Sequence, residues 1–422
     1  MAASTFSEPL PRLNRTTART RRRQTGHHIE PIRSRWPVYA QDEIDAVAAV
    51  LHSGRVNALH HGDNCHRFES EFAQMCAVPH AIAVANGTLA LELALRAVGI
   101  APGDEVIVPA RSFMASASCI VAVGAVPVFA DVDPDTQNLN AETVAQAMSP
   151  KTRAVIAVHL AGHPCAMDEL TVLTEAYDIK IIEDCAQAHG ARFNGRPVGS
   201  FGHAAAFSFC TDKIMSTGGE GGMLLLREEE DWARAWAYKD HGKNPRTMPQ
   251  ASGGGRFLWL HDSFGSNFRM TEMQAAIGLQ QLRKLPDWLE TRRRHAAMLN
   301  EILAGQRALR LIVPADDCEP AYYKYYAFVR PERLAPGWSR DAILEAAIAA
   351  GLPCQSGSCP EIYREQACIR AGYRPESVLR SARQLGEESI MMPIDHTLDD
   401  DSIRTMGEVL RSVLDAASAK GN

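Results

Sequence analysis

The stretch Ile181-Ile182-Glu183-Asp184 is an apolar run that ends on a carboxylate, and Phe207-Ser208-Phe209-Cys210-Thr211-Asp212-Lys213 is a second run that leads to a lysine. Ligands in open α/β sheets bind outside the carboxyl ends of the strands. Asp184 is therefore a candidate to face a cofactor, although aspartate is also a common helix N-cap.

Lys213 stands between the second run and a stretch that is nearly free of side chains, Gly218-Gly219-Glu220-Gly221-Gly222. Such a stretch allows the backbone to pass close to a neighbouring group. A lysine held there can lose solvation and become an amine nucleophile. The alternative is an ordinary surface-loop lysine.

Around these runs, short apolar segments alternate with helical patterns, which predicts a mostly parallel sheet covered by helices on both faces. The fold class is therefore α/β, with a large sheet domain and a smaller C-terminal α+β domain. The expected strands are His80–Ala85, Asp104–Pro109, Pro127–Val132, Ala154–His159, Lys180–Asp184, Ala204–Ser208 and Met223–Leu226.

Three regions are expected along the chain. Residues 1–35 contain eight arginines and no apolar period, which predicts a disordered basic arm. Residues 36–285 would form the large domain and 286–422 the small one. Pro286 is expected to break the chain between one helix, Thr271–Leu282, and the next, Thr291–Leu303.

Composition excludes several classes of protein. The net charge of −6 argues against a generally basic nucleic-acid binder, and the three consecutive arginines Arg21 to Arg23 form only a small patch. The longest apolar stretch is interrupted by Gly124 and Pro127, so no membrane span is expected. Ten cysteines without zinc-type spacing indicate reduced thiols in a cytoplasmic protein and no metal site. The arm resembles a transit peptide only weakly, and a solvated tail is the better interpretation.

A third motif, Asn86-Gly87-Thr88, follows a strand and opens a helix, so its N–H groups and the helix dipole can hold a phosphate. A phosphate cradle, an aspartate at a strand end and a lysine 29 residues later together match the needs of pyridoxal 5'-phosphate (PLP). Lysine forms a Schiff base with this cofactor, and aspartate keeps the ring nitrogen protonated.

The sequence resembles the DegT/DnrJ/EryC1/StrS aminotransferases, PLP-dependent enzymes of fold type I, from about Asp42 to about Leu410. The matching stretches are Ala85-Asn86-Gly87-Thr88, Pro102-Gly103-Asp104-Glu105-Val106-Ile107-Val108-Pro109, Glu183-Asp184-Cys185-Ala186-Gln187-Ala188-His189-Gly190, Phe207-Ser208-Phe209, Lys213, Gly219-Glu220-Gly221-Gly222 and Gly265-Ser266-Asn267-Phe268-Arg269-Met270. Their order over this length makes the resemblance specific.

The resemblance implies a role for each matching residue. Lys213 would carry the Schiff base and move protons, while Asp184 would pair with the ring nitrogen. The remaining cofactor contacts would be Gln187 near the ring hydroxyl, Phe113 on the ring face, and Gly87, Thr88, Leu89 and Ser208 at the phosphate. Asn267 would reach the phosphate in a neighbouring subunit, which implies a homodimer with shared active sites.

The implied reaction moves an amino group from glutamate or glutamine to a keto sugar, expected to be nucleotide-linked, or to a keto-cyclitol. Candidate acceptor-pocket residues are His189, Arg269, Tyr322 and Tyr325, although core or interface packing explains the tyrosines and an interface ion pair explains Arg269 equally well. A dehydratase of the same fold carries histidine in place of the lysine, so Lys213 argues against it. A non-catalytic PLP-binding regulator has only the basic arm in its favour.

Overall fold

The computed structural model describes residues 31–59, 62–246 and 259–419. Its centre is a seven-stranded sheet in the order β1-β9-β8-β5-β4-β2-β3. β9 runs antiparallel to both of its neighbours, and the remaining pairs are parallel, which confirms the predicted mostly parallel sheet. The strands are β1 (His80–Val84), β2 (Glu105–Pro109), β3 (Val126–Ala130), β4 (Thr152–Val158), β5 (Lys180–Asp184), β8 (Ala204–Ser208) and β9 (Gly222–Leu226).

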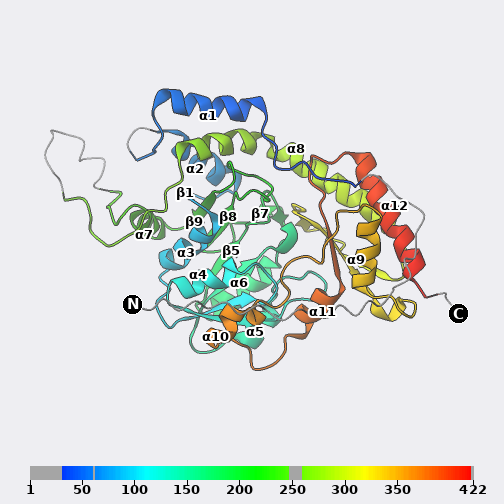
Figure 1. Ribbon diagram of the computed structural model, residues 1–422. Helices are drawn as coiled ribbons and strands as arrows, with labels where there is room; N and C mark the ends of the chain where they lie inside the picture. Colours follow the sequence, from blue (N-terminus) through cyan, green and yellow to red (C-terminus); the bar gives the residue numbers. More distant parts are fainter. Residues whose placement is uncertain (1–30, 60–61, 247–258, 420–422) are drawn as a thin grey trace, which may run out of the picture.

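Helices cover both faces of this sheet (Figure 1). Alternate residues of β1 point to opposite faces, so Ile82 and Val84 join one apolar core while Ala81 and Ala83 join another. The covering helices are α2 (Asn64–Met75), α3 (Gly87–Ala97), α4 (Ala115–Ala122), α5 (Ala141–Ala147), α6 (Met167–Ala176) and α7 (Glu229–Lys239), whereas α1 (Gln41–Ser53) packs on α8 (Glu272–Leu303). Burial on both faces explains why the strands read as nearly continuous apolar runs.

Two smaller sheets accompany the large one. β6 (Arg192–Phe193), β7 (Arg196–Pro197) and β11 (Cys318–Glu319) form a short antiparallel sheet. The C-terminal part is built on β10 (Leu309–Leu311), β12 (Tyr325–Val329) and β13 (Ser389–Met392), with a separate apolar core. Its helices are α9 (Arg340–Ala349), α10 (Gln366–Ala371), α11 (Arg380–Glu388) and α12 (Asp400–Ala417).

The predicted helix break at Pro286 is wrong. α8 runs without interruption from Glu272 to Leu303, and Thr271 caps its N-terminus by accepting a hydrogen bond from the Gln274 N–H. Proline removes one backbone donor, but packing on both sides of it outweighs this loss. Leu285 and Leu289 lie in a core of the large sheet, whereas Leu299 and Leu303 lie in the C-terminal core. We propose that two domains exist and that α8 crosses the boundary between them.

The predicted basic arm is only partly within the described residues, because residues 1–30 lie outside them. For residues 31–35 the expectation of disorder is wrong. The Ile32 N–H donates to the Gly351 carbonyl at 3.1 Å, and the Arg35 N–H donates to the Thr397 hydroxyl at 3.0 Å. These bonds hold the segment, here called the N-terminal strap (residues 32–36), against the C-terminal domain.

Candidate active site

A large cavity lies where the strand ends of the sheet meet the C-terminal domain. Its volume is about 1240 Å³. The neighbouring parallel strands β5 and β8 bring Asp184 and Ser208 to the same edge, as expected for carboxyl ends of parallel strands. The sequence-predicted residues that line this cavity are Gly87, Thr88, Leu89, Phe113, Asp184, Gln187, Ser208 and Lys213.

Asp184 is buried at the end of β5 and is held by two donors. The Ser116 hydroxyl donates to Oδ2 at 2.9 Å, and the Ala186 N–H donates to Oδ1 at 3.1 Å. Burial raises the pKa of Asp184 above its ordinary value. No described cation lies within 4.0 Å of the carboxylate, so the site can accept a positively charged ligand atom.

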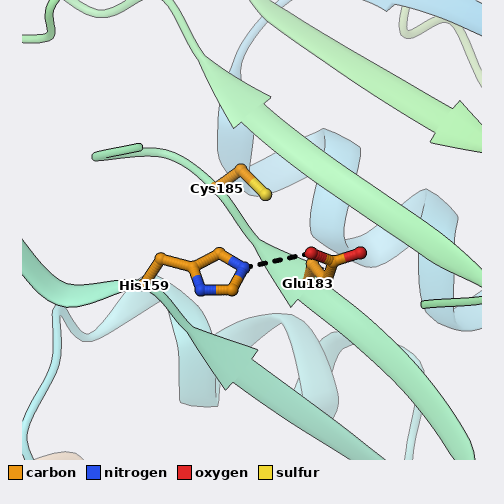
Figure 2. A group of neighbouring side chains, drawn as sticks. All are labelled: His159, Glu183 and Cys185. Atoms are coloured by element: carbon orange, nitrogen blue, oxygen red, sulfur yellow. Dashed lines mark hydrogen bonds and ion pairs between the residues drawn. The ribbon is translucent and has the colours of Figure 1, made fainter. Parts of the chain in front are cut away.

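The two neighbours of Asp184 in the chain, Glu183 and Cys185, are not among the residues that line the cavity. They lie close to His159 (Figure 2). Glu183 Oε2 accepts from His159 Nε2 at 3.1 Å and from the Gly199 N–H at 2.7 Å, and Oε1 accepts two further backbone N–H groups. Nδ1 of His159 accepts from the Cys165 N–H at 3.0 Å. Cys185 lies beside this pair. The carboxylate of Glu183 and the imidazole of His159 are thus occupied by hydrogen bonds that hold β5 in place next to Asp184.

Lys213 enters the cavity from the loop between β8 and β9. Its side chain is 15% exposed, and Nζ lies 3.9 Å from Oδ1 of Asp212. Asp212 also accepts a hydrogen bond from the Tyr323 hydroxyl, and Nζ of Lys213 lies 5.0 Å from the centre of the Tyr323 ring. The backbone carbonyl of Lys213 accepts a 2.8 Å hydrogen bond from the Trp36 indole, so the strap fixes this loop. The alternative of an ordinary surface lysine does not fit this environment.

The N-terminus of α3 lies directly against Ser208. A Cβ added at Gly87 would lie 2.6 Å from the Ser208 Cβ, so only glycine permits this approach. N–H groups in the first turn of a helix have no acceptor within the helix and can bind an anion. Asn86 caps α3 and its Oδ1 accepts from the Leu89 N–H at 2.9 Å, so this N–H already has a partner.

Gln187 and Phe113 lie on two other sides of the cavity. Oε1 of Gln187 accepts a 2.7 Å hydrogen bond from the Ala161 N–H, which leaves its amide NH₂ as the free donor end. Phe113 follows β2, lines the cavity and is 68% exposed, which is unusual for a large aromatic side chain. Its ring is therefore available to contact a ligand.

Five predicted site residues lie outside the cavity. His189 is buried between Phe207 and Phe209, and Tyr325 is buried in the C-terminal core with its hydroxyl donating to Asn300. Tyr322 packs against the same core. Packing thus accounts for both tyrosines. Arg269 pairs with buried Asp240 at 2.6 Å and lines a separate hollow of about 330 Å³, and Asn267 is exposed beside it.

Several cavity residues were not singled out as site residues by the sequence patterns. Ser116 of α4 donates a hydrogen bond to Asp184. In the sequence, the only indication of this role is that Ser116 stands one helical turn after Ser112. Tyr323 and Lys324 belong to a run of four tyrosines at positions 322, 323, 325 and 326, which the lysine interrupts. Arg33 and Ser34 come from the strap, which was expected to be disordered. Gly357 and Ser358 also line the cavity.

Comparison with known proteins agrees with this geometry. The sequence profile of the DegT/DnrJ/EryC1/StrS aminotransferase family matches residues 37–411. The chain belongs to this family. It is therefore an aminotransferase, built on the mostly parallel sheet described above.

Relatives of known name support the same assignment. L-glutamine:2-deoxy-scyllo-inosose aminotransferase of Streptomyces paromomycinus is 38% identical over 305 residues, which are 70% of this chain and 72% of that protein. The solved aminotransferase from Psychrobacter cryohalolentis is 45% identical, with a TM-score of 0.89 over 91% of this chain and 99% of that one. Spr1654 from Streptococcus pneumoniae, assigned as a sugar aminotransferase and solved in its PLP form, is 26% identical with a TM-score of 0.81 over 92% of this chain and 99% of that one.

No helix within the described ranges is both long and apolar enough to cross a membrane.

Proposed function

We propose that this aminotransferase uses PLP to move the amino group of L-glutamine or L-glutamate to the keto group of a cyclitol or a sugar. The observation that supports the proposal is a cavity lined both by Asp184, a buried carboxylate with no described cation within 4.0 Å, and by Lys213, whose side chain is 15% exposed. The relatives named above act on such substrates or are solved with this cofactor.

The residues present fit the cofactor. Asp184 would pair with the ring nitrogen, because a cationic ligand atom offsets the burial that raises the pKa of this carboxyl group. Gly87, Thr88 and Ser208 would hold the phosphate, with Leu89 next to them in the first turn of α3. Gln187 would donate its amide to the ring oxygen, and Phe113 would cover the ring face. When bound, PLP supplies an electron sink for the bonds of the donor carbon.

The remaining steps belong to residues of the chain. Nζ of Lys213 would take the proton from the reacting carbon of the donor and deliver one to the reacting carbon of the acceptor. Asp212 and Tyr323 position this amine. Oδ1 of Asp212 lies 3.9 Å from Nζ, and the Asp212 carboxylate accepts a hydrogen bond from the Tyr323 hydroxyl. General acid–base help of this kind contributes about 10²- to 10⁴-fold to a rate.

A homodimer and a cytoplasmic location are parts of the same proposal. Asn267 is exposed on a segment whose backbone pairs with Asp240, away from the cavity of its own chain, so it would serve the site of a second subunit. All ten cysteines are free, in agreement with a reducing compartment.

The proposal is tested by a visible spectrum of the purified protein with PLP, before and after L-glutamine or L-glutamate. We expect an absorption band of the lysine-linked cofactor in the visible range. One of the two amino acids should bleach this band. Lys213→Ala should keep its circular dichroism spectrum but lose the band of lysine-linked cofactor and the amino transfer. A stable band that neither amino acid changes would contradict L-glutamine and L-glutamate as amino donors and would favour dehydratase chemistry. Turnover that persists in Lys213→Ala would contradict the role of this lysine.

A further inference from the structure

Lys324 is a cavity residue to which the proposed reaction has assigned no role. It directly precedes β12 (Tyr325–Val329) and lines the cavity beside Tyr323. Its Nζ lies 4.9 Å from the centre of the Tyr323 ring, while Nζ of Lys213 lies 5.0 Å from the centre of the same ring. Both ammonium groups therefore pack against the same aromatic ring, which places Lys324 in the neighbourhood of the amine at which the substrates would react.

No carboxylate of the described chain lies within 4.0 Å of Nζ of Lys324, and the two acidic groups nearest to it have other partners. Asp212 accepts from the Tyr323 hydroxyl and faces Lys213. Asp395 accepts from the N–H and the hydroxyl of Thr397, at 3.0 and 2.6 Å. Burial and the neighbouring Arg292 lower the pKa of Lys324. A half-buried ammonium that has an aromatic ring but no carboxylate beside it is stabilised by a ligand that supplies an anion.

The anion that fits this position belongs to the amino donor. The phosphate of the cofactor already has a proposed cradle of its own, which α3 and Ser208 form without Lys324. Neither a keto-cyclitol nor a keto sugar carries a charge at its reacting carbon, and the phosphates of a nucleotide-linked sugar are attached at a different carbon. By contrast, the reacting carbon of L-glutamine or L-glutamate bears a carboxylate, so a cation is needed close to Lys213.

We propose that Lys324 binds the α-carboxylate of the amino donor and thereby selects α-amino acids as donors. This inference rests on the proposed function, because it requires that an amino acid reacts at Lys213. Ammonium and carboxylate form a charge-assisted hydrogen bond, which is about twice as strong as a neutral one.

The test measures binding instead of turnover. PLP-loaded wild type and Lys324→Met are titrated calorimetrically with the α-methyl analogues of L-glutamine and L-glutamate, which cannot lose a proton from the α-carbon. The expected result is about 10- to 100-fold weaker binding of the preferred analogue to Lys324→Met. Lys324→Arg keeps the charge and should bind within a few-fold of wild type. Lys151→Met, a change of an exposed lysine, should bind as wild type.

A second ligand separates loss of the carboxylate contact from general damage. 4-Aminobutanamide is L-glutamine without its α-carboxylate, so its binding should be equal in wild type and Lys324→Met. Equal affinity of the methyl analogues for both proteins would overturn the proposal, as would a parallel loss for 4-aminobutanamide. A wild type that binds PLP but none of these amines overturns the donor assignment itself. A wild type without any cofactor band overturns the proposed function and this inference together.

Discussion

The indole Nε1 of Trp36 donates a 2.8 Å hydrogen bond to the backbone carbonyl of Lys213. Trp36 also packs edge-on against Trp288 and His396, which are stacked on each other with ring centres 4.2 Å apart. A residue next to the N-terminal arm thus holds the loop of the reactive lysine against α8 and the C-terminal domain. The strap is therefore part of the active-site scaffold.

Trp36→Phe tests this connection, since it keeps an aromatic ring but removes the donor. We expect the free energy of unfolding to fall by about 1 kcal/mol, the usual contribution of one hydrogen bond. We also expect several-fold weaker binding of PLP, because the Lys213 loop loses one restraint. Urea denaturation and a PLP titration measure the two effects. Trp338→Phe, in the C-terminal domain, should leave PLP binding unchanged. Equal PLP affinity in wild type and Trp36→Phe would remove the strap from the scaffold.

Asp184→Asn should separate stability from cofactor affinity. The apoprotein should keep its free energy of unfolding to within about 1 kcal/mol, because the change removes a buried charge while an acceptor oxygen remains. PLP affinity should fall at least about 30-fold, since the ring nitrogen loses its charged partner. Equilibrium dialysis and thermal melts of the apoprotein check these results. Ser116→Ala is a milder companion change, which removes one donor to the carboxylate. Undiminished PLP affinity in Asp184→Asn would assign the ring nitrogen to another group.

Gly87→Ala should destabilise the protein even though alanine favours helices. The added Cβ would lie 2.6 Å from the Ser208 Cβ, and such overpacking costs about 1–3 kcal/mol. The double variant Gly87→Ala/Ser208→Gly removes the obstructing side chain and should recover most of the stability without recovering PLP affinity. Thermal denaturation and PLP titration of the single and double variants provide the comparison. If the double variant were no more stable than Gly87→Ala, contact with Ser208 would not be the cause.

His189 should make stability sensitive to mild acid. Burial lowers the pKa of His189 to about 3, below its ordinary value of 6.5. The unfolded chain therefore takes up a proton as the pH falls below about 6.5, whereas the folded chain does not. The stability due to neutral His189 is complete above pH 6.5 and is lost toward pH 3, by about 1.4 kcal/mol per pH unit.

The check is a series of urea denaturations between pH 7 and pH 4. His189→Phe should show a shallower loss of stability than wild type over this range, while the exposed His52→Gln should follow wild type. A decline remains in His189→Phe because burial also lowers the pKa of His396, to about 4. Identical slopes for wild type and His189→Phe would contradict the burial of an uncharged imidazole at this position.

Local patterns in the sequence were sufficient to predict the sheet and to propose the centre of the site. Apolar runs with polar ends located all seven strands, and β5 and β8 lie at their expected residues. Because the strand ends follow from those same runs, Asp184 and Lys213 could be proposed as site residues together with the fold. The Asn86-Gly87-Thr88 turn followed from the same logic.

Contacts between distant segments could not be read from the sequence. Nothing in the run around Pro286 shows that two cores pack along one helix, so a local rule for proline predicted a break that packing overrides. The strap has no apolar period because it is held by single hydrogen bonds and by Trp36. Lys324 reaches the cavity through the pairing of β12 with β13, which brings together residues more than 60 positions apart.

The unbroken course of α8 has a mechanical consequence. At 1.5 Å per residue, its 32 residues form a rod of about 48 Å that is rooted in a core of the large sheet at one end and in the C-terminal core at the other. Any opening of the cavity that swings the C-terminal domain outward must bend this rod or pivot about it. The strap is fastened to the same rod, because Trp36 packs against Trp288 of α8, so a movement of α8 is passed to the loop of Lys213 through the hydrogen bond of Trp36.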